Sequence, residues 1–303
     1  MSAPRRAVSR RRIDGVLLLD KCAGISSNHA LQAARRLFNA EKAGHTGTLD
    51  PLATGLLPIC FGEATKFSAE LLEADKRYSA TVQLGVATAT ADAEGEVLSR
   101  RPVVVGADQI VQVLDGFLGE IEQVPPMHSA LKRDGRPLYD YARAGIEVAR
   151  APRRVRIHAL HLRAMNPERQ RFEFDVVCSK GTYVRTLAAD IGERLGCGAH
   201  LAALRRTGIG RLDISDAYAH AALEAMSPEQ RDRLLSPADA LLSDLPEVRL
   251  DAADAARLRH GQPVRWPDAD ANRCRAYAGD DFLGLCRIGE DGWLRPQRLR
   301  SGE

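Results

Sequence analysis

Apolar and polar positions alternate in recognisable blocks along the first forty residues. Residues 13–20 form a short apolar run between charged residues, which predicts a buried strand. A glycine-containing turn over residues 21–27 follows and ends in two serines that suit the start of a helix. Residues 28–39 then repeat apolar side chains with helical spacing. One predicted helix face carries Leu31, Ala34, Leu37 and Phe38, and another carries Arg35 and Arg36.

Strand patterns dominate the middle of the chain. Residues 79–90 are rich in β-forming types and alternate, so Tyr78 lies near the start of a predicted strand. Residues 155–162 and 171–178 alternate in the same way. Two helix patterns separate or follow these strands, one over residues 107–118 and one that passes through Leu187, Ile191 and Leu195. Residues 92–96 contain the polar and glycine positions typical of a turn.

The last eighty residues change character twice. From residue 221 the chain is helical and acidic, with prolines near residues 228, 237 and 246, which predicts a linker region. From residue 248 a helix-like segment is followed by short β-like pieces. A chain of 303 residues can hold one full-sized core and a small second domain. We therefore expect a main domain over residues 13–245, a second domain over residues 246–303, and a disordered, arginine-rich arm over residues 1–12.

Charge is concentrated more than the formal net charge of +3 suggests. Residues 132–156 hold eight basic and three acidic side chains, and the arm at residues 1–12 holds five more arginines. Such clusters can be ordinary solvated surface, but two of them in a chain of low net charge favour local contact with a polyanion. Nucleic acid is the candidate partner.

Several classes of protein are disfavoured by what the sequence lacks. The six cysteines include no C-x-x-C pair, which argues against a zinc site or a disulfide scaffold. Apolar runs stay well below the roughly 18 residues of a membrane helix, and the basic N-terminus has no apolar signal core. We expect a cytoplasmic protein without metal.

One stretch, residues 44–67, combines a loop with an unusually placed carboxylate. Glycines and polar residues precede Asp50, and Pro51 biases Asp50 away from helical backbone angles. After Gly55 the chain becomes apolar, which would bury the segment and hold the loop. An acid on a braced loop is a candidate reactive group. Asp-Pro between glycines is also ordinary turn chemistry, so the residues alone leave both interpretations open.

The words GHTGTLDPLATGLLPICFGEATKFS closely resemble the signature of the bacterial tRNA pseudouridine-55 synthases. In that family the aspartate of this word is the catalytic nucleophile, so the resemblance gives Asp50 this role. The K-x-Y word gives Tyr78 the place beside the target uracil and the handling of its C5 proton. The SKGTYVR word implies that Arg185 pairs with Asp50 and that Tyr183 lines the uracil pocket. Arginine suits this pairing because its planar fork stays charged and favours an ionised acid.

Four further assignments follow from the same resemblance. The resemblance implies that His45 fills the space left by a flipped base and that Leu204 is an apolar wall of the pocket. Without the motif, His45 and Leu204 would be taken for an ordinary structural histidine and a core leucine. Lys21 and Lys132 are expected to contact RNA. The motif at residues 21–27 usually has a proline in the family at the position of Cys22. Without this proline the backbone of the turn is less restricted.

The fold implied by the resemblance is of the α+β class. It has a pseudouridine synthase catalytic domain with a mixed, largely antiparallel sheet, an insertion at about residues 124–154 that clamps RNA, and a small C-terminal PUA-like β-barrel that binds RNA. The implied reaction isomerises the uridine at position 55, in the T-arm loop of tRNA, after base flipping. Atoms are conserved, so no cofactor is expected.

Two alternatives share the same RNA surface. A non-catalytic tRNA-binding or RNA-folding protein would bind tRNA without needing Asp50 for a product. A synthase guided by a separate RNA and partner proteins would need those partners. Because the resemblance gives the chain its own insertion and RNA-binding tail, we expect a monomer that needs no obligatory protein partner.

Overall fold

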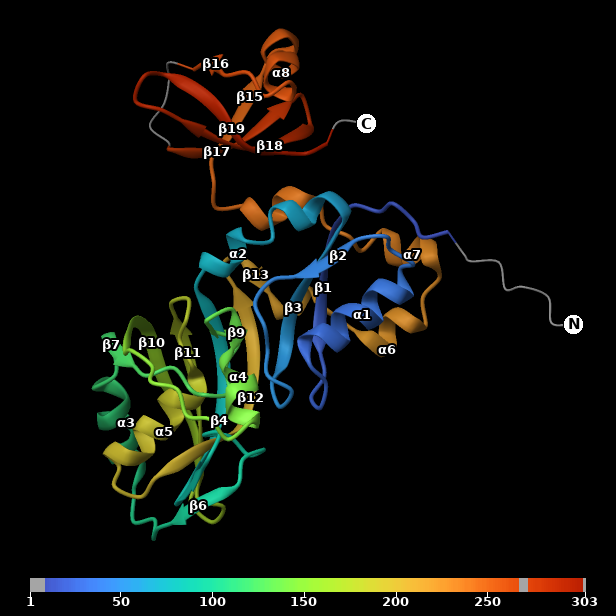
Figure 1. Cartoon of the computed structure of the whole chain (residues 1–303). Helices are drawn as coiled ribbons and strands as arrows, with labels where there is room; N and C mark the ends of the chain where they lie inside the picture. Colours follow the sequence, from blue (N-terminus) through green and yellow to red (C-terminus); the bar gives the residue numbers. More distant parts are fainter. Residues whose placement is uncertain (1–8, 267–271, 302–303) are drawn as a thin grey trace, which may run out of the picture.

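The computed structural model describes residues 9–266 and 272–301, which form two β-rich parts (Figure 1). The main part contains β1 (Gly15–Lys21), α1 (Ser27–Leu37), β2 (Ala43–His45), β3 (Thr54–Phe61), η1 (Gly62–Lys66), α2 (Glu70–Glu73), β4 (Lys76–Leu84), β5 (Val86–Thr88), β6 (Val97–Arg100), α3 (Ala107–Asp115), β7 (Gly119–Gln123), β8 (Lys132–Arg133), β9 (Arg136–Pro137), α4 (Leu138–Arg143), β10 (Arg153–Asn166), β11 (Arg171–Cys178), α5 (Val184–Arg194), β12 (Ala199–Ile209), β13 (Leu212–Asp213), η2 (Ile214–Asp216), β14 (Tyr218–Ala219), α6 (His220–Glu224), α7 (Pro228–Asp232) and η3 (Ala238–Leu242). The C-terminal part contains β15 (Glu247–Leu250), α8 (Ala252–Arg259), β16 (Val264–Arg265), β17 (Arg273–Ala278), β18 (Asp281–Ile288) and β19 (Trp293–Leu299).

A single mixed sheet organises the main part. Its strand order is β14-β1-β3-β12-β4-β11-β10-β7, with β2 added to β3 and β13 added to β12. Most neighbours are antiparallel, but β12 runs parallel to β3 and β14 runs parallel to β1. The α+β class and the mixed sheet predicted from the sequence are confirmed. The central strand β12 lies between β3, which follows the Asp50 loop, and β4, which carries Tyr78.

The two faces of this sheet are both covered near β1 and β3. Leu17 and Leu19 face one core with the buried sides of α1, α3 and α5, whereas Val16 and Leu18 face a second core. Burial on both faces explains why residues 13–20 read as a continuous apolar run rather than as an alternating one. The helix predicted over residues 28–39 is α1, whose buried side includes Leu31 and Ala34.

The segment predicted as a linker is instead part of the main body. Leu223 of α6 lies in the first core, and Leu241 and Leu242 of η3 lie in the second. The backbone of Ser236 also pairs with Val16 through two hydrogen bonds of 2.8 and 2.9 Å. The acidic residues and prolines predicted a linker because these short helices bury only a few apolar side chains, too few to form a visible pattern.

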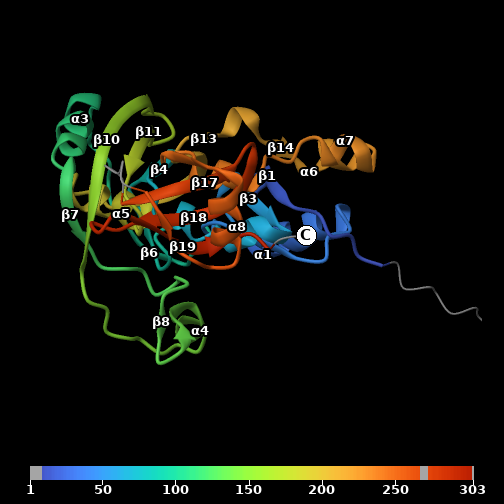
Figure 2. The same ribbon diagram turned by 90° about the horizontal axis from the view of Figure 1, so that it is seen from above.

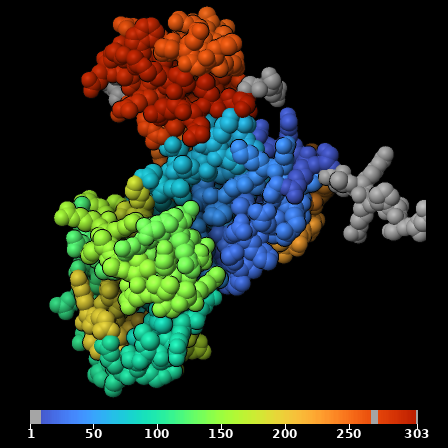
Figure 3. All heavy atoms as spheres, viewed as in Figure 1, coloured from blue at the N-terminus to red at the C-terminus, as the bar shows by residue number. Residues whose placement is uncertain are grey.

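The predicted insertion is a protruding segment between β7 and β10. It holds the two-stranded β8–β9 ladder and α4, and Figure 2 shows this segment standing away from the main sheet. In the space-filling view it lies against the N-terminal part of the body (Figure 3). Its stem passes the candidate site, because the carbonyl of His128 accepts a hydrogen bond from Arg185 at 2.7 Å.

The C-terminal part is a separate five-stranded sheet in the order β15-β17-β18-β19-β16, crossed by α8. This half-barrel fits the PUA-like domain that was expected. It has its own core around Ala255 and Leu258. Its other side joins the second core of the main part, where the rings of Phe67 and Phe282 are 5.2 Å apart. The two parts therefore share a packed apolar contact.

Residues 9–12 of the predicted basic arm are described, and residues 1–8 lie outside the described residues. Arg11 does not belong to a disordered arm. Its backbone bridges to Ala40, and its guanidinium pairs with Asp232 of α7. The expectation of disorder through residue 12 is therefore wrong at Arg11.

Candidate active site

The loop that carries Asp50 spans residues 46–53, between β2 and β3. Two contacts fasten it to the start of α1. The Ser27 hydroxyl donates to the Leu49 carbonyl at 2.9 Å and accepts from the Leu49 amide at 2.7 Å. The Gly24 amide donates to the Pro51 carbonyl at 2.9 Å. The carboxylate of Asp50 is thus held on a braced loop, and its side chain remains 39% exposed.

Lys21 supports this loop from inside and is not placed to contact RNA. Its side chain is buried, and its ammonium donates to the carbonyls of Cys22, Ile25 and Pro51 at 2.9, 2.8 and 3.4 Å. All three hydrogens of an ammonium can be satisfied by these carbonyls. The prediction that Lys21 binds RNA is therefore wrong, because the group it would offer is enclosed by its own backbone.

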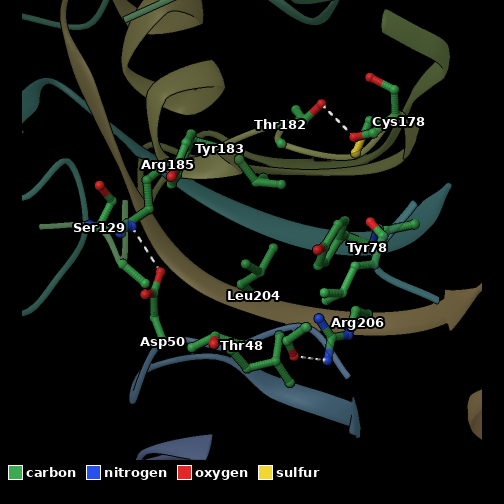
Figure 4. Close-up of a pocket in the computed structure, with 18 residues that line it drawn as sticks. Thr48, Asp50, Tyr78, Ser129, Cys178, Thr182, Tyr183, Arg185, Leu204 and Arg206 are labelled. Atoms are coloured by element: carbon green, nitrogen blue, oxygen red, sulfur yellow. Dashed lines mark hydrogen bonds and ion pairs between the residues drawn. The ribbon is translucent and has the colours of Figure 1, made fainter. Parts of the chain in front are cut away.

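Arg185, in the first turn of α5, holds the carboxylate. Its Nε lies 2.9 Å from Oδ2 of Asp50, and only 5% of its side chain is exposed. The same guanidinium donates to the carbonyls of Thr90 and His128 at 3.1 and 2.7 Å. The ion pair implied by the resemblance is present (Figure 4), and the two carbonyls fix the arginine further.

A second carboxylate, Asp92, shares this arginine. Its Oδ2 lies 3.5 Å from Nη1 of Arg185, and its side chain is buried. Asp92 is fixed in turn by the Glu94 amide, which donates to Oδ1 at 3.1 Å. Residues 92–96 were predicted only to form a turn, and Asp92 was not predicted as a site residue. The turn is real, and no residue spacing indicates that β12 brings it to α5.

Burial and pairing act on Asp50 in opposite directions. Removal from water raises the pKa of the Asp50 carboxyl, the Arg185 guanidinium lowers it, and the nearby Asp92 raises it again. The net direction is upward. Arg185 therefore favours the ionised acid, as expected, but burial has the larger effect on the pKa.

A cavity of about 270 Å³ opens next to Asp50. Tyr78, Tyr183 and Leu204 line it together with Arg185 (Figure 4). Burial raises the pKa of the Tyr78 hydroxyl, which keeps the phenol neutral. Because drug-sized ligands occupy pockets of about 300–1,000 Å³, this cavity suits a smaller group such as one planar ring. The structure thus brings together five predicted residues that are up to 154 positions apart in sequence, from Asp50 to Leu204.

A neighbouring groove runs between the Asp50 loop and the insertion. Its volume is about 530 Å³, and its lining includes His45, Asp50, Tyr139 and Arg143. Burial, followed by the charge of Arg206, lowers the pKa of the His45 imidazole and favours the neutral ring. Lys132, by contrast, is exposed on β8 and lines neither cavity. It is available to an external partner but not to a group bound in the pocket.

Comparison with solved structures defines the class of protein. The archaeal box H/ACA ribonucleoprotein Nop10–Cbf5 complex matches with a TM-score of 0.71 and 23% identity, over 94% of this chain and 85% of the compared chain. A Cbf5–Nop10–Gar1 complex matches with a TM-score of 0.69 and 26% identity, over 90% of this chain and 78% of the compared chain. The chain has the pseudouridine synthase fold.

Comparison at the sequence level narrows the class to a family. The model of the TruB family pseudouridylate synthase N-terminal domain matches residues 35–184, and two TruB C-terminal models match residues 185–243 and 246–299. The tRNA pseudouridine synthase B of Ralstonia nicotianae is 57% identical over 96% of this chain and 95% of its own length. That of Azoarcus sp. is 56% identical over 97% of each. The chain belongs to the TruB family and is a pseudouridine synthase.

The described helices have neither the length nor the apolar surface that crossing a bilayer requires.

Proposed function

We propose that this chain isomerises one uridine, at position 55 in the T-arm loop of tRNA, to pseudouridine. Its relatives from Ralstonia nicotianae and Azoarcus sp., which align over nearly their full length, are named tRNA pseudouridine synthase B. The observation that carries the proposal for this chain is the Asp50–Arg185 pair at the edge of a cavity of about 270 Å³. A reactive carboxylate beside a ring-sized pocket is what the reaction requires.

The reaction exchanges one glycosidic bond for another. The N1–C1′ bond breaks, the uracil turns within the pocket, and a C5–C1′ bond forms while the C5 proton is lost and N1 gains one. Asp50 acts as the nucleophile. Its carboxylate is bonded covalently to one of the two fragments, uracil or ribose, between the breaking of the first bond and the forming of the second. Arg185 orients the carboxylate and opposes the effect of burial, so that the ionised form is available.

The base reaches this site by flipping out of the RNA loop. Flipping a base costs a few kcal/mol, which stacking and hydrogen bonds in the pocket must offset. Tyr78, Tyr183 and Leu204 offer two aromatic rings and an apolar wall for this purpose. Tyr78 handles the C5 proton. His45, at the end of β2 just before the Asp50 loop, takes the place of the departed base in the neighbouring groove.

The remaining surfaces hold the RNA. The insertion at about residues 124–154 clamps the stem-loop through exposed cations that include Lys132 and Arg143, and the half-barrel within residues 246–303 contacts a more distant part of the tRNA. The catalytic domain then spans residues 13–245. The enzyme works in the cytoplasm as a monomer, without a guide RNA or partner protein.

The test is to incubate the purified chain with an unmodified tRNA transcript and map pseudouridine along the RNA. A single product at position 55, absent from a transcript with cytidine there, is expected. Tight binding without any product would favour the non-catalytic RNA-binding alternative. Product that appears only after a guide RNA and proteins are added would overturn independent action.

A further inference from the structure

Arg206 is among the largest fully buried side chains of the described residues and takes no direct part in the proposed reaction. It is 1% exposed. Among the ion pairs of the described residues, none includes Arg206. Charged side chains are rarely buried without a counter-ion, because desolvation is costly. A retained cation in such a place calls for a specific function.

The guanidinium joins the two ends of the Asp50 loop. Its Nη2 donates to the Gly47 carbonyl at 3.0 Å, and its Nε donates to the Leu56 carbonyl at 2.8 Å. Gly47 stands three residues before the acid and Leu56 six residues after it. Arg206 therefore closes the base of the loop by contacts to its backbone.

The backbone at this point is shaped for the same contact. Gly55 pairs with Arg206 in the β3–β12 ladder and has a φ of 103°, which favours glycine. A Cβ at Gly55 would lie 2.3 Å from the Arg206 carbonyl oxygen. Only glycine, which has no Cβ, lets the β3 backbone pass this close to the backbone of β12.

Arg206 also borders the other side of the pocket. It stands opposite Tyr78 in the antiparallel β12–β4 ladder. Figure 4 shows Tyr78 and Arg206 together on one side of the cavity, with Asp50 and Arg185 on the other. The charge of Arg206 opposes the rise that burial causes in the pKa of Tyr78. One side chain thus contacts the loop of the acid and neighbours the tyrosine.

We propose that Arg206 is a positioning residue for the isomerisation, which bridges the ends of the Asp50 loop from the strand beside Tyr78 and so fixes the carboxylate and the phenol across the pocket. This inference rests on the proposed function. Arginine suits the task because its rigid planar fork presents two separate nitrogens, Nε and Nη2, to the two carbonyls, whereas lysine offers a single nitrogen on a flexible stem. Gly47 and Leu56 would then move independently.

The test compares Arg206→Lys and Arg206→Gln with the wild type and with Arg231→Gln. Arg231 is a matched control, since it is also buried and donates to the Leu37 carbonyl at 2.6 Å, but it lies on α7 and lines neither cavity. Thermal unfolding, tRNA affinity and the single-turnover rate at saturating tRNA are measured for each protein, well below its unfolding temperature.

Misplacing a reacting group by about 1 Å can cost about 100-fold in rate, so Arg206→Gln should lose about that factor, and Arg206→Lys on the order of tenfold. Affinity for tRNA should change by less than about threefold, because the RNA-facing surface is intact. Arg231→Gln should lose stability but keep its rate.

The outcomes separate the two proposals. An inactive wild type would refute the proposed function itself. With an active wild type, a normal rate in Arg206→Lys or Arg206→Gln would overturn the positioning role, and so would a loss of affinity as large as the loss of rate. If Arg206→Gln does not fold, Arg206→Lys decides alone, since it retains a cation at the same place.

Discussion

At the scale of single residues, the site is a set of charges placed where burial works against them. Asp50 is held by Arg185, which in turn serves Asp92 and two carbonyls. A buried ionised acid is unfavourable without such support, and its reactivity in water-poor surroundings follows from the same cause. The pKa of Asp50 therefore lies above the ordinary range despite the adjacent cation.

The first prediction concerns pH. A raised pKa means that Asp50 takes up its proton at a higher pH than a free aspartate, whose pKa is about 3.9. If the carboxylate is the active form, the single-turnover rate should fall as pH is lowered through a midpoint above that value. Circular dichroism at each pH separates this loss from unfolding. A rate that stays constant down to pH 4 would contradict the assignment.

The second prediction concerns Arg185. Replacing it with alanine leaves Asp50 unpaired and Asp92 without its cation, so turnover should fall by a factor of about 1,000, in the range typical of lost electrostatic support. Affinity for tRNA should change little. Arg194→Ala is the matched control, since Arg194 lies in the last turn of the same helix and stacks on Phe117 away from the pocket. Equal losses of turnover and affinity would sink the proposed role.

At the scale of elements, the spacing of apolar residues predicted those helices and strands that bury one or two faces against a core. The runs that became β1, α1, β4, α3, β10, β11 and α5 could be read because their apolar positions face one core or two. The linker predicted from residue 221 onward was wrong. The short helices there expose most of their surface and bury only Leu223, Leu241 and Leu242 among their large aliphatic side chains. Residues 204–207 (LRRT) resemble an active-site word of the family, but the contacts of Arg206, like the place of Asp92, depend on strand pairing between distant parts of the sequence.

The third prediction concerns the insertion. Lys132 is exposed on β8, and Arg143 lines the groove. Replacing both with alanine should weaken tRNA binding and reduce the slope of log affinity against log salt by about 0.7 to 0.9 for each lost phosphate contact. Turnover at saturating tRNA should be nearly unchanged.

Two exposed arginines of β10, outside the insertion, provide the control. Arg156 and Arg163 face Glu120 and Asp175, at 3.7 and 3.5 Å. Their double alanine variant should leave affinity and salt slope close to those of the wild type. If both double variants weaken binding alike, the insertion has no special part in holding RNA.

At the scale of the whole molecule, two sheets are joined through one shared core. Phe67 and Leu71 of the main part pack with Phe282 and Leu285 of the C-terminal half-barrel. A contact of this kind holds the half-barrel at a set position relative to the pocket. Under the proposed function, this contact would present the insertion and the half-barrel to tRNA at a fixed spacing, which suits recognition of RNA by shape.

The fourth prediction concerns removal of the C-terminal part. Ending the chain before residue 246 should lower the unfolding temperature, because Phe67 and Leu71 become exposed. The main sheet should still form, since its first core, including the partly buried residues packed against it, lies within residues 13–235. Affinity for tRNA should fall, while slow turnover persists at saturating RNA. Complete loss of folding would instead show that the half-barrel is a structural requirement.

The most direct test of the account is pseudouridine formation in unmodified tRNA by wild type and by Asp50→Asn, with binding measured in parallel. Since burial raises the pKa of Asp50, its ionised form is disfavoured in the fold, and the neutral amide should not reduce the unfolding temperature. We expect product from the wild type only, with equal tRNA affinity and intact folding in both. Product from Asp50→Asn at the wild-type rate would contradict the central claim.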